Sequence, residues 1–318
     1  MSDINKKKFS LYRLLNEGNG KGVKKEEKER KRDLKFYFVL FGRRFGAIIK
    51  LNLIWLAANF PIFFALFAAS GYAGKQTTAP ASVFFSVLDP LVRSGQSNPV
   101  IASLFGITGI KGTMFINTPL TYVMYALGLL AVFTFGPANV GVIYNLRNIV
   151  RGEPLFLLSD FRDAVKKNFK QSLIYGIIDA LIIGVLVFDI ANYAGMMRYI
   201  AIAIGVIYML MRIYIYIMIP TFDLSLYKMF KNALIFTSVN LKRNVPCVIG
   251  WALILFINYG LLNVFFPLGA VMPFALTISA VLYTGVYCAW PSIKEIMIDP
   301  YTEEKEEPEK KPIFTDRG

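Results

Sequence analysis

Asp179 and Arg212 are the residues best placed to do chemistry, because each carries a charge inside a long run of apolar sequence. Measured along a helix, Asp179 lies about 10 Å from the start of the run 172 to 194, and Arg212 about 13 Å from the end of the run 199 to 221. Ionisable side chains are costly in such surroundings, so both are candidate functional residues. Since a tight turn joins the two runs, we expect the charges to reach similar depths and to form an ion pair.

The sequence leaves the purpose of this pair open. It could lock two helices together, it could form a ligand or proton site, or the two side chains could make no contact. The nearby Tyr residues of the stretch YMLMRIYIYIMIP could stack on sugar rings, but the sequence favours a lipid-facing or helix-packing face for them.

Other catalytic chemistry lacks the residues that it needs. The chain has no His, which removes the imidazole base, the Ser-His-Asp triad and zinc sites with His ligands. Its two cysteines, Cys247 and Cys288, lie far apart in sequence near the ends of apolar runs and are expected to be reduced, buried thiols. No phosphate-binding glycine loop is present. We therefore expect no enzyme, no cofactor and no metal site.

The elements that position these residues are predicted from composition. The chain has 318 residues, of which 55% are hydrophobic and 15% aromatic, and the apolar residues are bunched into runs rather than spread at amphipathic spacing. A helix needs roughly 20 apolar residues to cross a bilayer. Six runs meet that length, at residues 46 to 70, 119 to 145, 172 to 194, 199 to 221, 246 to 268 and 270 to 292.

These runs predict an all-α polytopic integral membrane protein, with six transmembrane helices in a domain over residues 46–292 and short amphipathic cytosolic helices beside them. Residues 1–45 are expected to form a charged cytosolic segment that ends in an interfacial helix, at FYFVLFGRRFG. Residues 293–318 are expected to be a charged, disordered cytosolic tail.

The orientation follows from the positive charges, because loops rich in Lys and Arg tend to stay in the cytoplasm. From the N-terminus, the segments outside the runs carry 14, 3, 6, 1, 4, 0 and 5 such residues. This alternation predicts a multi-pass protein with both termini in the cytoplasm. It also predicts an outer segment at 71–118 and cytosolic loops at 146–171 and 222–245.

The net charge of +14 could suggest nucleic acid as a partner, but the basic residues lie beside apolar runs on one side of the membrane. Anionic lipid headgroups are the natural counter-charge there, each Lys or Arg contributing about 1 kcal/mol. We therefore expect a bilayer with anionic headgroups as partner, and no nucleic acid.

The stretch SDFRDAVKKNFKQS is polar and basic, with Phe161, Val165 and Phe169 recurring every four residues. This spacing predicts an amphipathic helix in the second cytosolic connection. A related pattern, three residues longer, recurs between Phe230 and Arg243, which suggests a duplicated unit of span, cytosolic helix and span. Such helices could rest among lipid headgroups or dock a protein partner; the candidate docking residues are Phe161, Arg162, Phe169, Phe230 and Lys231.

Several stretches together resemble a family. They are GNGKGVKKEE, FGRRFGAIIKLNLIWL, GPANVGVIYNLRNIVRGEP, SDFRDAVKKNFKQS and MFKNALIFTSVNLKRN. With these the chain resembles the YesL-like bacterial membrane proteins, a family of unknown function. The resemblance implies a location in the bacterial cell membrane and a role beside carbohydrate-uptake systems, particularly sugar ABC importers. This chain departs from compact members through its extended N-terminus and its outer segment.

Two functional hypotheses follow. In the first, the protein is a non-enzymatic accessory or regulatory subunit of carbohydrate uptake that docks importer subunits through its cytosolic helices. In the second, it is a small-solute transporter with Asp179 and Arg212 in the path and a helix break at Pro137 near the site. An intramembrane enzyme has only scattered carboxylates in its favour. The sequence predicts no substrate and no oligomeric state.

Overall fold

The computed structural model describes residues 33–80, 99–100, 103 and 111–300. Most of the charged N-terminal segment, the stretch SVFFSVLDPLV of the outer segment and the tail from residue 301 lie outside the described residues. The described elements, in chain order, are α3 (Leu34–Arg43), α4 (Phe45–Ala58), α5 (Ile62–Ala69), β1 (Lys75–Pro80), β2 (Lys111–Ile116), α8 (Pro119–Arg151), α9 (Leu157–Lys167), α10 (Phe169–Asn192), α11 (Met196–Met218), α12 (Leu226–Val239), α13 (Leu241–Val264), α14 (Phe266–Met272), the π-helical turn η1 (Pro273–Thr277) and α15 (Ile278–Met297).

The described chain is predominantly helical, as expected, and its helices suit a membrane protein. Five helical segments are long and apolar enough to cross a bilayer: α8, α10, α11, α13, and α14 with η1 and α15. The run at 46 to 70 is divided into α4 and α5 by a sharp bend, and counts as a further span only if the bent pair is taken together. The length and apolar character of these helices place the protein among multi-pass helical membrane proteins.

A smaller compact unit covers residues 60–131. In it β1 and β2 pair antiparallel, with Lys75 opposite Ile116. This ladder was not expected from the sequence, because it joins segments separated by the long stretch between them. The Oγ1 atoms of Thr118 and Thr121 both donate to the Ala73 carbonyl, at 2.6 and 2.9 Å, and so hold the base of the ladder against the start of α8.

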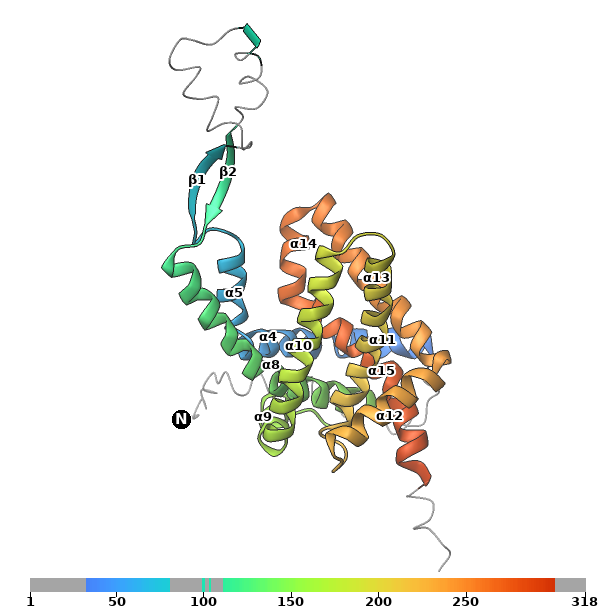
Figure 1. The fold of residues 1–318 in the computed structure, drawn as a ribbon. Helices are drawn as coiled ribbons and strands as arrows, with labels where there is room; N and C mark the ends of the chain where they lie inside the picture. The colour runs from blue at the N-terminus through green and yellow to red at the C-terminus, as the bar shows by residue number, and fades with distance from the viewer. Residues whose placement is uncertain (1–32, 81–98, 101–102, 104–110, 301–318) are drawn as a thin grey trace, which may run out of the picture. The chain divides into compact units, whose positions relative to one another are not determined.

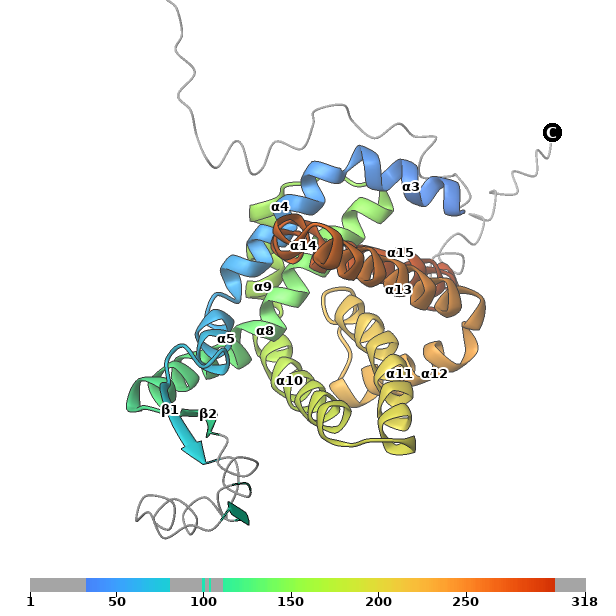
Figure 2. The same cartoon turned by 90° about the horizontal axis from the view of Figure 1, so that it is seen from above.

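The larger unit covers the described residues before 60 and after 131. Its core lies around the second half of α11, where every side chain from Ile213 to Met218 is buried, and around α15. In it α10 packs against α11 and α13 packs against α15 (Figures 1 and 2). The exposed faces of α10 and α13 are apolar, as expected for helices surrounded by lipid.

The helix α3 packs on α15 rather than lying only in the membrane interface. The hydroxyl group of Tyr37 is 2.8 Å from Oγ1 of Thr284, and the Tyr287 hydroxyl donates to the Asp33 carbonyl at 2.7 Å. Phe36 and Leu40 are buried on the same side of α3. A helix therefore forms where the sequence predicted an interfacial one, and one face of it is a protein contact.

The last span differs from the prediction in two places. The turn after α13 lies at Phe265, not at Gly269, because Gly269 packs directly on the backbone of Leu262. In addition, α15 continues to Met297 with Ile293 fully buried, so the expected tail begins as an ordered helix.

The π-helical turn η1 is stabilised from α4. The side-chain amide of Asn52 donates to the carbonyls of Pro273 and Phe274, at 3.0 and 2.6 Å, and its oxygen accepts from the Ser279 amide at 2.8 Å. These bonds satisfy backbone groups that the irregular turn would otherwise leave unpaired in an apolar region.

Two helix pairs form similar elbows in the larger unit. In the first, which we call elbow 1, α9 breaks at Asn168 and the chain continues as α10. In the second, elbow 2, α12 breaks at Asn240 and continues as α13. The helix α9 has 11 residues and α12 has 14, which matches the difference of three residues between the two sequence patterns.

Candidate functional site

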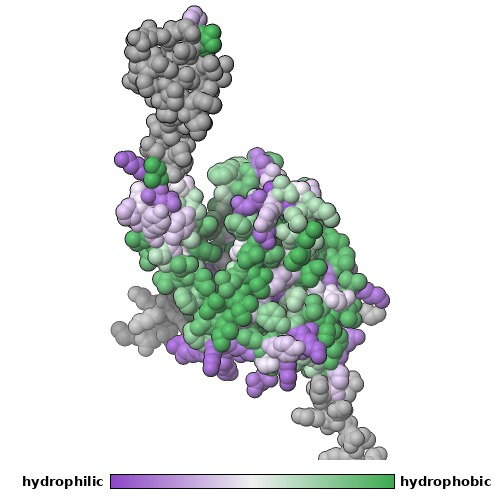
Figure 3. Space-filling model, viewed as in Figure 1, coloured by the Kyte–Doolittle hydropathy of each residue, from purple (hydrophilic) through white to green (hydrophobic). Residues whose placement is uncertain are grey.

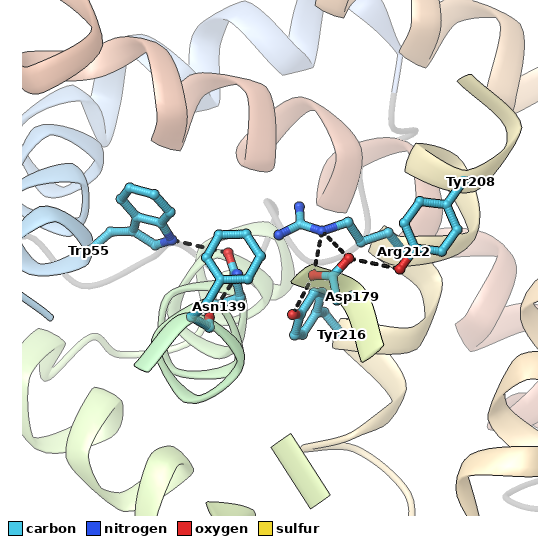
Figure 4. Close-up of polar contacts among 7 residues, drawn as sticks. Trp55, Asn139, Asp179, Tyr208, Arg212 and Tyr216 are labelled. Atoms are coloured by element: carbon cyan, nitrogen blue, oxygen red, sulfur yellow. Dashed lines mark hydrogen bonds and ion pairs between the residues drawn. The ribbon is translucent and has the colours of Figure 1, made fainter. Parts of the chain in front are cut away.

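Asp179 and Arg212 lie against each other in the interior of the larger unit (Figure 4). Nε of Arg212 is 2.8 Å from Oδ2 and 3.0 Å from Oδ1 of Asp179. Asp179 is 0% exposed and Arg212 is 8% exposed, so water screens this ion pair little. The pair joins α10 to α11, which follow each other through a tight turn at Gly195, where a φ of +63° suits a residue without a side chain.

Two tyrosines complete the surroundings of the carboxylate. The Tyr208 hydroxyl donates to Oδ1 at 2.8 Å, and the Tyr216 hydroxyl donates to Oδ2 at 2.6 Å. Tyr208, Arg212 and Tyr216 are spaced four residues apart on α11, so they lie on one face of the helix. We call these residues and Asp179 the Asp179 cluster. Each carboxylate oxygen accepts two hydrogen bonds, one of them from a phenol.

The other side of the Arg212 guanidinium faces aromatic rings. Its Cζ lies 5.2 Å from the centroid of the Phe135 ring and 5.0 Å from that of Tyr216, distances typical of cation-π contacts. Beyond them, the Trp55 indole donates to Oδ1 of Asn139 at 3.0 Å (Figure 4). The cluster therefore has the chemistry of a lock, because the guanidinium and the two phenols occupy both oxygens of the carboxylate with hydrogen bonds.

The two helices beside the cluster approach unusually closely. A Cβ atom added at Gly136 on α8 would lie 2.0 Å from the Ser172 carbonyl oxygen, and one added at Gly176 would lie 2.5 Å from Cα of Gly136. Only glycine at both positions allows this crossing of α8 and α10. The sequence indicated neither this contact nor the roles of Tyr208 and Tyr216; the four-residue spacing of Tyr208, Arg212 and Tyr216 was the available signal.

The candidate docking residues do not share one surface. The ring of Phe161 packs over Gly141, where an added Cβ would lie 2.4 Å from it, and the ring of Phe230 packs edge-on against Tyr175, with centroids 5.6 Å apart. Both rings therefore belong to the packing between helices. Phe169, by contrast, is 51% exposed, and Arg162 and Lys231 are exposed as well. Phe161 and Phe230 are partly buried in these packing contacts, and their role as docking residues stays a prediction.

The surface around α9 is polar. Figure 3 shows hydrophilic side chains gathered along the edge of the molecule where α9 lies, below an apolar band. At the start of α9, Oδ2 of Asp160 accepts from the Phe156 amide at 2.9 Å. Burial raises the pKa of Asp160, and this hydrogen bond opposes the rise.

The two cysteines lie on helices that pack against each other, although they are far apart in sequence. Cys247 on α13 is buried, Cys288 on α15 is partly buried, and both are free thiols. Within residues 33–80 and 111–300, no group of three or more His, Cys, Asp or Glu side chains is arranged to hold a metal ion.

Comparison with known proteins gives one match. Residues 48–190 match the model of a family described as "Protein of unknown function, DUF624". The matched range includes α9, the Gly136–Gly176 crossing and Asp179, and ends before Arg212. No curated protein and no solved structure matches the chain. The chain is thus similar, over α4 to α10, to a family whose function is unknown.

Proposed function

We propose that this protein is a six-span membrane protein with both termini in the cytoplasm, acting as a non-enzymatic accessory or regulatory subunit of bacterial carbohydrate uptake. Counting α4 and α5 as one span gives six. The alternation of Lys and Arg then supports cytosolic locations for α9 and α12. The link to sugar importers rests on the resemblance to the YesL-like family.

The observation that carries the accessory role is the exposed basic surface of elbow 1. Arg162, Lys166, Lys167 and Lys170 are all exposed, and the apolar ring of Phe169 is exposed among them. Across elbow 2, Lys228 and Lys231 add exposed positive charge. By charge complementarity, the partner that fits is an acidic, cytosol-facing surface of an importer subunit, which such a patch would attract and orient.

The Asp179 cluster supports the same proposal by elimination. The carboxylate has its hydrogen-bonding capacity filled by protein donors, as in an ion pair that fixes helix positions. We therefore assign it the role of holding α10 against α11, so that elbow 1 has a defined geometry.

The proposal is tested by gentle solubilisation of native membranes that contain the tagged protein, followed by identification of whatever co-purifies in stoichiometric amount. We expect importer subunits to co-purify with the wild type and to be lost with Arg162→Glu. The matched control is Lys75→Glu, an equal change of charge at an exposed residue of β1. Recovery of the chain alone would reject the accessory role, and retention of the partner by Arg162→Glu would reject α9 as the docking surface.

A transporter is the second candidate, favoured by one observation. Within the described residues, the hydrogen bonds of Arg212 run from Nε, and its two terminal amino groups make none. These groups lie beside Phe135, two residues before Pro137, which lies inside the continuous helix α8, and they could bind an oxygen-rich solute. The transporter hypothesis predicts solute flux by the purified protein in vesicles; folded protein that supports no flux would contradict it.

A further inference from the structure

A polar cavity lies between elbow 1 and the segment that follows α11. Its volume is about 410 Å³. From elbow 1 it is lined by Lys167, Asn168, Lys170 and Gln171, and from the segment after α11 by residues including Thr221 and Asp223. The cavity is large enough for a phosphate group together with a small organic group attached to it.

The cavity is positively charged. Lys167 and Lys170 are both exposed, and within the described part of the chain neither forms an ion pair. Asp223, also exposed, is the acidic residue of the lining. Two unpaired ammonium groups at one opening, with a single carboxylate, favour an anion.

The start of α10 adds to this preference. Asn168 is the N-cap residue of this 24-residue helix, and its side chain makes no capping hydrogen bond. Its Nδ2 instead donates back to the Ala164 carbonyl of α9 at 2.9 Å. The positive end of the α10 dipole therefore borders the cavity without a side-chain acceptor, which is an arrangement that attracts anions.

A buried arginine contacts one of the residues that line the cavity. Arg147 is 5% exposed, and its Nη1 donates to Oγ1 of Thr221 at 2.6 Å. Its Nε is buried and has no hydrogen-bond partner in the described structure. The nearby carboxylate of Glu153 is 2.7 Å from Arg151, and the flanking groups of Arg147 are the rings of Tyr144 and Trp290.

This arginine is the second, independent sign of an anion site. Buried charges are normally paired, because desolvation without a counter-charge is costly. In the described residues Arg147 has no carboxylate of its own, and one hydroxyl group separates it from the cavity. An anion held by Lys167 and Lys170 would be separated from Arg147 by Thr221 and would offset part of its charge through space.

We propose that this cavity binds the phosphate ester of a small polyhydroxyl compound. A phosphate carries enough charge and enough acceptor oxygens to engage both lysines and the start of α10 together, while the Thr221 hydroxyl donates to the Ile217 carbonyl and accepts from Arg147. Asp223, on the opposite side of the lining, can accept a hydrogen bond from a ligand hydroxyl. The ester could be a soluble sugar phosphate or the headgroup of a glycerol phospholipid, and the experiment separates these sources.

The test uses the full chain in phosphatidylcholine nanodiscs. Glucose 6-phosphate and glycerol 3-phosphate are titrated by calorimetry, and retention of phosphatidylglycerol is measured by native mass spectrometry. The test variant is Lys167→Gln with Lys170→Gln. The matched control is Lys35→Gln with Lys242→Gln, which removes the same charge from exposed residues of α3 and α13 outside the cavity. Thr221→Val serves as a second variant that changes no charge.

We expect binding of one probe class to weaken at least about tenfold in the Lys167 and Lys170 variant, to weaken in Thr221→Val, and to stay within about twofold of wild type in the control. Loss of sugar phosphate binding identifies a soluble ligand, and selective loss of phosphatidylglycerol identifies a headgroup. Equal losses in test variant and control, or no binding of either probe class, would overturn the proposal. Neither result depends on whether an importer co-purifies.

Discussion

Elbow 1 and elbow 2 share a plan and differ in what holds them. In each, a helix of the expected cytosolic face breaks at an Asn and continues as a long apolar helix. Beyond the break, α10 carries the buried Asp179 and binds α11 through charge. In contrast, α13 has no charged residue after Arg243 and is fixed by neutral contacts, including the hydrogen bond from the Trp251 indole to the Val281 carbonyl at 2.8 Å.

This difference indicates that elbow 1 has the better defined position. A buried ion pair tolerates little displacement, because separation leaves two charges in an apolar interior. Neutral packing allows small shifts at lower cost. Elbow 1 also borders the cavity and exposes Arg162, Lys166, Lys167 and Lys170. The Asp179–Arg212 ion pair therefore fixes the geometry of the surface that we propose as the docking site.

The largest effect is expected at the Asp179 cluster. Asp179→Asn leaves Arg212 buried without a counter-charge, so the free energy of unfolding should fall by about 3 to 5 kcal/mol. Asp189→Asn, on the same helix but outside the cluster, is the control and should change it little. Reversible unfolding in mixed micelles measures both.

A double-mutant cycle sharpens this prediction. Asp179→Leu with Arg212→Met removes both charges, so the double variant should lose less stability than the two single variants together. If the losses add, or if Asp189→Asn costs as much as Asp179→Asn, the cluster does not act as the lock of elbow 1.

The next largest effect concerns how closely each elbow packs on its neighbour. Gly136→Ala places a Cβ 2.0 Å from the Ser172 carbonyl, a backbone atom that cannot move alone, and should destabilise by about 1 to 3 kcal/mol. Gly250→Ala on α13 meets the Cγ2 of Thr284 at 2.8 Å, a side-chain atom that can move, and should cost less. Thermal unfolding in detergent ranks the two.

Gly184→Ala provides the baseline, because nothing lies within 4 Å of its added Cβ and alanine favours a helix. We expect no loss of stability there. A loss at Gly184 equal to that at Gly136 would mean that glycine matters along α10 for reasons other than the close crossing.

The parts of this fold that the sequence predicted are those with an unambiguous signal. A charge in an apolar run has few explanations, so Asp179 and Arg212 could be paired before the structure was known. The aromatic residues on α11 carry no such signal, because a Tyr suits lipid, helix packing and hydrogen bonding alike. Tyr208 and Tyr216 were therefore missed as donors to the carboxylate.

The amphipathic pattern of α9 and α12 did not predict what the apolar face of each helix contacts. An apolar face fits a headgroup layer, a partner or the protein itself, and periodicity does not distinguish them. Phe161 packs inward because Gly141 leaves room for its ring, and Phe230 because Tyr175 offers an edge. The contact between Gly136 and Gly176 was not predicted for a related reason, because a glycine in a sequence does not indicate which segment packs against it.

The smallest effect is expected at the two Asn residues of the breaks. Nδ2 of Asn168 donates to the Ala164 carbonyl, so Asn168→Ala should cost about 1 kcal/mol. Nδ2 of Asn240 is buried without a partner in the described structure, so Asn240→Ala should cost nothing or stabilise slightly. In elbow 2 the bonds to the end of the preceding helix come from Asn244, whose Nδ2 donates to the carbonyls of Phe236 and Thr237.

Comparing the unfolding free energies of these variants shows whether equivalent positions in the two sequence patterns stabilise the two elbows equally. Asn244→Ala, which also loses the hydrogen bond from the Tyr214 hydroxyl at 2.9 Å, should cost more than Asn240→Ala. Equal losses at Asn168 and Asn240 would mean that the elbows are held alike and that the difference between them lies in the Asp179 cluster alone. Unequal losses would mean that the stabilising amide of elbow 2 is that of Asn244, one helical turn further along α13. The sequence similarity would then predict where each helix breaks, but not which hydrogen bonds stabilise the break.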